Sequence, residues 1–145
     1  MKLLGLALIV LGFVSTSHAL TLKEKKQLAD WQTELETGDA ATQFKTKCGY
    51  AMPVTLDEKF VTPFMETDMT ASGSCDQAMG SMATMCEDAT SKASINKQVK
   101  KLNCKFASKG PAAFKLVGTT LEFTFSSESS NLDSQTKTFL ENNLR

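Results

Sequence analysis

Four sulfur-bearing side chains in the middle of the chain have a spacing that could support chemistry. The stretch GSCDQAMGSMATMC, residues 73–86, places Cys75, Met79, Met82 and Cys86 at intervals of four, three and four residues. On an α-helix such side chains share one face. Thioether and thiolate sulfurs are soft ligands that suit Cu(I). The spacing therefore indicates a soft-metal site, a redox site or a helix face that enters a core.

The copper interpretation depends on the pattern M-x-x-M-x-x-M formed by Met79, Met82 and Met85. Methionine is also a flexible apolar residue that fills cores. No histidine accompanies these methionines, and the cysteine spacings contain no C-x-x-C motif for zinc or thiol exchange. We therefore predict a buried core face and expect no metal or other cofactor. A copper-handling protein that uses these three methionines is the alternative.

The first nineteen residues have the composition of a secretory signal peptide. Met1 and Lys2 give a basic start, residues 3–14 are apolar, and STSHA follows with small residues where signal peptidase reads. Twelve apolar residues rise only about 18 Å as a helix, too little to cross a bilayer. We predict cleavage after Ala19. Residues 20–145 are then expected to be one disulfide-stapled domain, periplasmic or extracellular, with no membrane span.

Four cysteines remain after export, and an even number in an oxidising compartment predicts two disulfides. On a continuous helix Cys75 and Cys86 would lie about 16 Å apart, whereas a disulfide needs Cα atoms within about 7 Å. Two pairings remain: Cys48–Cys75 with Cys86–Cys104, or Cys48–Cys86 with Cys75–Cys104. We favour the first, because it joins neighbouring elements of the chain.

Missing residue types narrow the possible functions. The only histidine, His18, lies in the signal peptide, so the mature chain has no imidazole base or ligand. The only arginine, Arg145, is the last residue, and no phosphate-binding glycine motif is present. We expect a non-enzymatic protein. A hydrolase that uses carboxylates remains an alternative, with candidates Asp57, Glu58, Glu66, Asp68 and Asp76.

Helices are predicted in the first half of the chain. Thr21 and Glu24 form a capping-box pattern before a helix that ends at Gly38, and Asp39 is a candidate cap for a second short helix. An extended segment after Cys48 contains Pro53, which favours a sheet edge. We expect short helical pieces from Asp57 and from Thr62, holding Phe60, Phe64, Met65 and Met69, and then the sulfur-lined helix over residues 74–88.

The second half changes to the alternation that is typical of strands. Apolar residues occupy every second position in three runs, at Leu102, Cys104 and Phe106, at Phe114 and Leu116, and at Leu121, Phe123 and Phe125. A last helix, capped by Ser130 or Asn131, carries Leu132, Phe139, Leu140 and Leu144. The predicted class is α+β: a small antiparallel β-meander of about three strands with helices packed on one face.

Charge is balanced over the chain but not along it. The sequence has 16 Lys plus Arg and 16 Asp plus Glu, yet residues 20–95 carry net −5 and residues 96–145 carry net +4. Alternation turns Lys101 and Lys105 away from the core, and with Lys115 they are the candidate ligand-binding residues of a basic sheet face, extended by Lys97, Lys100 and Lys109. The other interpretation is a solvated face that protects a sheet edge.

These observations predict an exported, non-enzymatic binding or inhibitory module. The expected partner is a protein or an anionic component of the cell envelope. Nucleic acid is not expected, because the basic face lacks arginine and stacking aromatic side chains.

Overall fold

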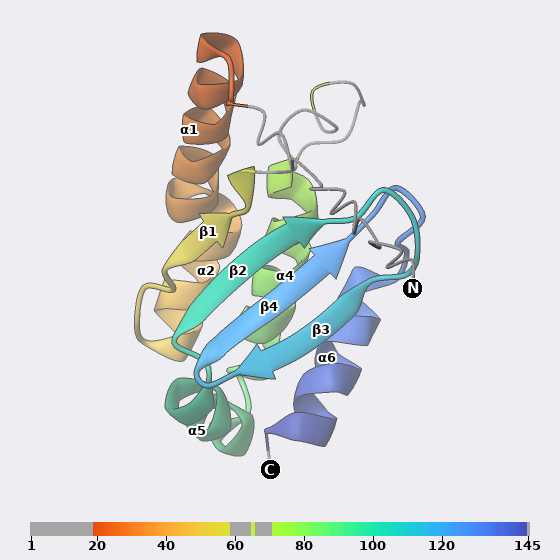
Figure 1. Cartoon of the computed structure of the whole chain (residues 1–145). Coiled ribbons are helices and arrows are strands. Elements are labelled where there is room, and N and C mark those ends of the chain that lie inside the picture. The colour runs from red at the N-terminus through yellow and green to blue at the C-terminus, as the bar shows by residue number, and fades with distance from the viewer. Residues whose placement is uncertain (1–18, 59–64, 66–70, 145) are drawn as a thin grey trace, which may run out of the picture.

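The computed structural model describes residues 19–58, 65 and 71–144. A four-stranded sheet is backed on one side by helices (Figure 1), so the predicted α+β class is confirmed. The signal-peptide residues 1–18, and most of the two short helical pieces expected between Asp57 and Met69, lie outside the described residues. In chain order the elements are α1 (Leu22–Thr37), α2 (Asp39–Cys48), β1 (Val54–Leu56), α4 (Ala71–Met85), α5 (Ala89–Gln98), β2 (Lys101–Phe106), β3 (Ala113–Val117), β4 (Thr120–Phe125) and α6 (Leu132–Asn143).

The capping box at the start of α1 forms as predicted. The Thr21 backbone N–H donates to Glu24 Oε2 at 2.7 Å, and the Glu24 N–H donates to Thr21 Oγ1 at 3.3 Å. Gly38 ends α1, but it also stands at the N-cap position of α2, so the expectation that Asp39 caps α2 is wrong. Asp39 instead lies in the first turn, where its charge faces the positive end of the helix dipole.

Helix α4 is the centre of the core, and its sulfur-lined face points inward. Cys75, Met79 and Met82 have no exposed surface, and Cys86, just past the end of the helix, is 4% exposed. The helix packs against α2 on one side and α6 on the other. The question raised by the spacing of these sulfurs is thus answered: they form a buried face.

The sheet differs from the predicted meander. Its order is β1-β2-β4-β3, with β1 parallel to β2, β2 parallel to β4, and only β3 antiparallel to β4. β4 carries Leu121, Phe123 and Phe125, all buried, whereas Phe114 and Leu116 of β3 are only partly buried. The more apolar strand therefore occupies the centre, and β3 is left at the edge. Pro53 precedes β1, which is the other edge strand, as predicted.

One helix was not predicted. α5 begins after Asp88, whose side chain accepts a hydrogen bond from the Ser91 N–H at 2.8 Å. Its apolar face is small: Ile95, with Val99 just beyond the helix, is buried. Too few apolar positions repeat for a periodicity signal, although Asp88 three residues before Ser91 is a recognisable N-cap.

The disulfides tie α4 at both ends. Cys48 at the end of α2 pairs with Cys86, and Cys75 near the start of α4 pairs with Cys104 of β2, with Cα–Cα distances of 5.2 and 6.2 Å. Two disulfides were predicted and Cys75–Cys86 was excluded, but the pairing we favoured is wrong. Sequence neighbours are not joined, because α4 runs across the sheet and brings its first turn, not its end, over Cys104.

Two features of the structure bear on where in or outside the cell the protein is found. No helix of the described part of the chain is long and apolar enough to cross a membrane. The two disulfides fit an oxidising compartment, either the periplasm or the extracellular space.

Candidate binding face of the sheet

One face of the sheet is free of described helices (Figure 1). In β2 the side chains of Leu102, Cys104 and Phe106 are buried under the helical layer. Successive side chains of a strand point to opposite faces, so Lys101, Asn103 and Lys105 lie on the other face, where they are partly exposed. The same alternation runs through β3 and β4. We call this surface, which no described helix covers, the outer face.

Register brings the three candidate lysines to the outer face from two strands. Lys101 is level with Thr120 of β4, and Lys105 with Thr124. Lys115 of β3 is opposite Glu122 of β4. The four strands carry these three ammonium groups and only one carboxylate, that of Glu122. The outer face of the strands therefore has a positive balance of charge among polar side chains.

The single carboxylate is already engaged. Lys105 Nζ lies 2.9 Å from Glu122 Oε1, and both side chains are slightly more than a quarter exposed. Beyond this pair, Thr55 of β1 donates to Asn103 Oδ1 at 3.2 Å. Lys101 and Lys115 have no ion pair within 4 Å among the described residues, so their charges remain available to a ligand.

The flanking lysines named from the sequence do not all join this face. Lys100 donates to the Asn96 carbonyl and lies 5.4 Å from the ring of Tyr50, a cation–π contact. The Tyr50 hydroxyl donates to the Val99 carbonyl, and burial raises the pKa of Tyr50 to about 12. Lys100 is thus engaged with Tyr50 and with Asn96 of α5.

The carboxylates proposed for a hydrolase are not gathered into one site by the described residues. Asp57 and Glu58 follow β1, Asp76 lies on α4, and Glu66 and Asp68 are outside the described residues. Burial, and then the charges of Glu34 and Asp39, raise the pKa of Asp76 from 3.8 to about 6. Asp76 Oδ1 is buried and has no hydrogen-bond partner in the described part of the chain, but Asp76 lines neither of the two hollows of this structure that are described in this section.

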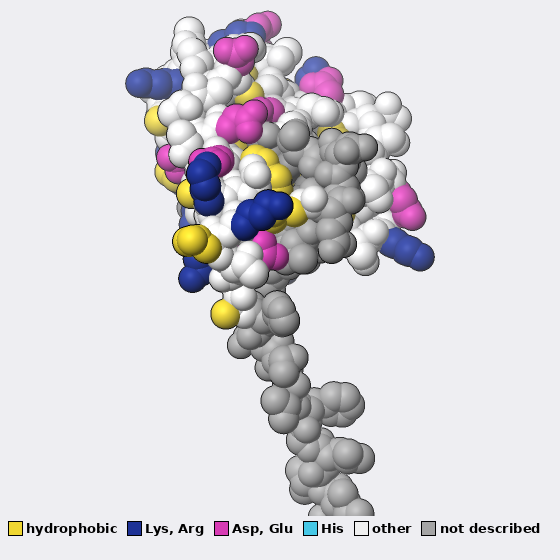
Figure 2. All heavy atoms as spheres, turned by 90° about the horizontal axis from the view of Figure 1, so that it is seen from above, with side chains coloured by type: hydrophobic (Ala, Val, Ile, Leu, Met, Phe, Trp, Pro, Cys, Tyr) yellow, Lys and Arg dark blue, Asp and Glu magenta, His cyan; other side chains and the backbone are white. Residues whose placement is uncertain are grey.

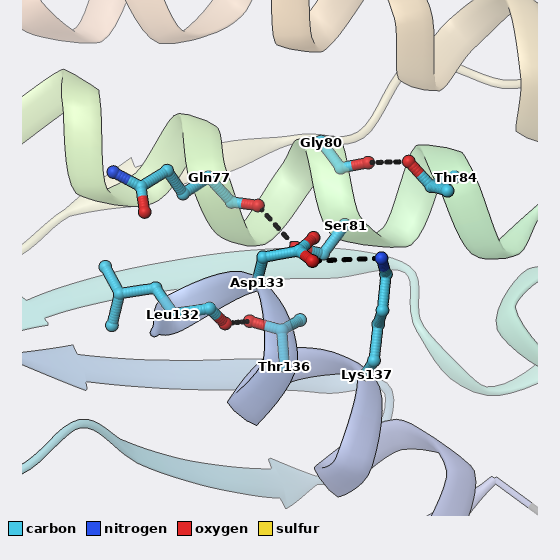
Figure 3. Close-up of polar contacts among 8 residues, drawn as sticks. All are labelled: Gln77, Gly80, Ser81, Thr84, Leu132, Asp133, Thr136 and Lys137. Atoms are coloured by element: carbon cyan, nitrogen blue, oxygen red, sulfur yellow. Dashed lines mark hydrogen bonds and ion pairs between the residues drawn. The ribbon is translucent and has the colours of Figure 1, made fainter. Parts of the chain in front are cut away.

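A polar contact between α4 and α6 was not predicted (Figure 3). Ser81 Oγ lies 2.6 Å from Asp133 Oδ1 and 2.8 Å from the Gln77 carbonyl, and Lys137 Nζ lies 2.9 Å from Asp133 Oδ2. The bonds from Ser81 and Lys137 hold the pKa of Asp133 below its usual value. Ser81 is 1% exposed, so its hydroxyl is closed to a substrate. This group joins two helices and is not a nucleophilic site.

The three methionines of the copper alternative differ in how far they are buried. Met79 and Met82 are fully buried in the core. Met85 is partly buried and lines a hollow of about 290 Å³ between α5 and the end of α6, together with Ile95 and Leu140. The four cysteines are all in disulfides and present no thiolate. This arrangement gives the copper alternative no support.

A second, larger hollow of about 640 Å³ lies between α1 and β1. Apolar side chains and a few polar ones line it: Ala19, Leu20, Lys25, Leu28, Ala29, Gln32, Thr55, Leu56 and Glu58. Figure 2 shows this end of the molecule, where hydrophobic side chains reach the surface between lysines and carboxylates. Sequence reasoning missed this hollow, because its two walls are separated by about twenty residues and carry no motif.

No protein-family model, curated protein or solved structure matches this chain significantly. The outer face of the sheet, with Lys101, Lys105 and Lys115, is therefore assigned as the candidate site from its geometry and charge alone.

Proposed function

We propose that this protein is an exported, non-enzymatic binding or inhibitory module that recognises an anionic partner on the outer face of its sheet. The observation that carries the proposal is the placement of Lys101, Lys105 and Lys115 on the outer face, with Glu122 as the only carboxylate on the four described strands. Exposed ammonium groups that outnumber carboxylates attract anionic surfaces and accelerate their association.

Two further points support the exported, single-domain part of this proposal. The predicted cleavage after Ala19 leaves Thr21 and Glu24, so the first helix of the mature chain retains its capping box. The two disulfides connect α2, α4 and β2, so they join the helical layer to the sheet. A chain stapled in this way suits an oxidising compartment.

The test is retention of the oxidised mature chain on immobilised poly-glutamate, eluted with a salt gradient. We expect retention at low salt that falls as salt rises, because exposed charges are screened. The triple variant Lys101→Gln, Lys105→Gln and Lys115→Gln should bind about tenfold more weakly, at about 0.5 kcal/mol for each exposed charge.

The matched control removes the same number of charges from the helices. Lys23, Lys45 and Lys92, all changed to glutamine, lie on α1, α2 and α5. This control should bind as the unaltered protein does. Equal loss in both triple variants would show that net charge alone drives retention, and absence of retention at low salt would refute the proposed function.

A further inference from the structure

The two edges of the sheet differ in how their backbone groups are satisfied. At the β1 edge, the Gln32 side chain of α1 takes the place of a neighbouring strand: its amide nitrogen donates to the Val54 carbonyl, and its oxygen accepts from the Leu56 N–H at 3.3 Å. One side-chain amide thus satisfies a donor and an acceptor that an added strand would otherwise bind. The β1 edge is closed.

The β3 edge has no neighbouring strand among the described residues. β3 and β4 are joined by the two-residue turn Gly118-Thr119, which makes Val117 and Thr120 a hydrogen-bonded pair. Hydrogen bonding alternates along an antiparallel ladder, so the N–H and C=O groups of Phe114 and Leu116 point away from β4.

An independent bond gives the same orientation. The Ala107 N–H donates to the Phe125 carbonyl, so Phe125 faces β2 and Thr124 faces β3. Within the described part of the chain, no hydrogen bond reaches the outward groups of β3. The strand contains no proline and no residue with positive φ, and Val117 is 47% exposed. β3 therefore presents a regular template for one more strand.

The charge of Lys115 favours one kind of added strand at this edge over another. Lys115 lies at the centre of β3 on the outer face, and its cross-strand neighbour Glu122 is already paired with Lys105. In the register that pairs the whole of β3 with a second copy, Lys115 would face its own counterpart in a close, non-hydrogen-bonded pair. Like charges in such a pair are destabilising, whereas a carboxylate there is stabilising. The edge therefore favours a strand with an acidic residue opposite Lys115.

The inner face of the edge selects apolar residues at the intervening positions. Phe114 stacks on Phe123 with ring centroids 4.9 Å apart and on Phe139 of α6 at 5.6 Å. Phe114, Leu116 and Phe139 are all partly buried, so apolar surface remains beside the edge. Side chains of an added strand that point inward would cover this surface, and those that point outward would meet Lys115.

We propose that the β3 edge receives an extended segment of a partner protein, with acidic and apolar residues in alternation, as a fifth strand. This inference rests on the proposed function and narrows it, because it names the chemistry of the partner and the place where it binds. The segment gains main-chain hydrogen bonds from Phe114 and Leu116 and an ion pair with Lys115.

The test uses fluorescent peptides and the oxidised mature chain. The first peptide alternates glutamate with valine; the second has the same composition with all glutamates in one block. Two further copies of the first peptide carry N-methyl groups on one or the other set of alternate amides. We expect the alternating peptide to bind at least about tenfold more tightly than the block peptide. N-methylation of only one set should abolish binding, because only that set faces β3.

Variants of the protein complete the test. Lys115→Gln should weaken binding about two- to fivefold, as expected for one cross-strand ion pair. Lys23→Gln on α1, away from the outer face, is the matched control and should have no effect. Lys115→Glu should reverse the preference toward a peptide that alternates lysine with valine.

The outcomes separate this inference from the proposed function. If both peptides bind equally and N-methylation has no effect while poly-glutamate retention persists, strand addition is refuted and recognition of anions stands. If, in addition, the unaltered protein is not retained on poly-glutamate, strand addition and the proposed function are both refuted. Concentration-dependent dimerisation in sedimentation, blocked by the alternating peptide, would show that a second copy occupies the edge and would overturn the assignment to an acidic partner.

Discussion

Two glycines of the helical layer differ in what surrounds them. A Cβ atom built on Gly38 would lie 2.6 Å from the Glu34 carbonyl oxygen, whereas one built on Gly80 of α4 would meet nothing within 4 Å outside its own helix. Gly38→Ala should therefore lower the free energy of unfolding by about 1–3 kcal/mol through overpacking. Gly80→Ala should raise it by about 0.5–1 kcal/mol, because alanine is the better helix former.

Urea denaturation of both variants measures this difference, and each serves as the control for the other. Equal effects of the two substitutions would contradict the assigned close approach at Gly38. The comparison tests a single backbone contact at the junction of α1 and α2, where Gly38 ends one helix and precedes the other.

Asp76 gives the fold a pH dependence of predictable sign. Its pKa is about 6 in the folded state and 3.8 when unperturbed, with Glu34 of α1 and Asp39 of α2 as its acidic neighbours. Between about pH 4 and 6 the folded protein holds a proton that the unfolded chain has released, so stability falls as pH rises through this window. Above pH 6 the ionised carboxylate continues to destabilise the fold.

Asp76→Asn should remove this effect. At pH 7.5 we expect the variant to be more stable by about 1 kcal/mol, less than the full shift implies, because Asp76 is partly exposed and solvent screens its charge. At pH 4 the gain should vanish. Chemical denaturation at both pH values provides the measurement, with Glu141→Gln, at an exposed position of α6, as a control. A gain of the same size at both pH values would refute the role assigned to the charge.

At the scale of elements, the Ser81–Asp133 contact couples α4 to α6. A double-mutant cycle with Ser81→Ala and Asp133→Ala should give a coupling of about 1 kcal/mol at pH 7, below that of a fully buried charged hydrogen bond because Asp133 is 60% exposed. The pKa of Asp133 is lowered in the folded state, so the coupling should be present above about pH 4 and be lost as pH falls further. Additive substitutions at pH 7 would show that the two helices are independent here.

The sequence predicted which faces of the elements are buried more reliably than how the elements are arranged. Alternation in β2 and β4 identified Leu102 and Phe123 as core residues, and the helical spacing did the same for Met79. Strand order was not accessible, because alternation reports a face and not a neighbour. A meander with the strand order β2-β3-β4 and the observed order β2-β4-β3 require the same alternation of apolar and polar residues.

The candidate site was predicted in part. The direction of Lys101 and Lys105 followed from alternation, but the closure of β1 by Gln32 depends on how α1 lies beside β1, about twenty residues away in sequence. The disulfide pairing failed for a similar reason. Proximity along the chain favoured Cys48–Cys75, whereas the path of α4 over β2 places Cys75 on Cys104.

For the molecule as a whole, the two disulfides determine how the helical layer is attached to the sheet. They enclose separations of 38 and 29 residues, and loops of this length are worth about 3–4 kcal/mol each in the chain-entropy model. Cys75→Ala with Cys104→Ala should lower the free energy of unfolding by about this amount, and Cys48→Ala with Cys86→Ala is the matched variant. Guanidinium denaturation of oxidised samples measures both.

A peptide map of the untreated mature chain checks the pairing directly. We expect one linked peptide pair containing Cys48 and Cys86 and another containing Cys75 and Cys104. A linked pair of Cys48 and Cys75 would instead support the pairing that sequence proximity favours. Four free thiols would remove the covalent attachment of α4 altogether.

The side-chain amide that seals one rim of the sheet has a consequence for assembly. A sheet with two open rims can add copies of itself without limit, and such growth leads to fibres. Here Gln32 occupies the β1 edge, so copies of this chain can pair only through β3, and pairing of two β3 edges ends at a dimer. Edge pairing between copies of this chain would therefore give closed pairs of sheets and not fibres.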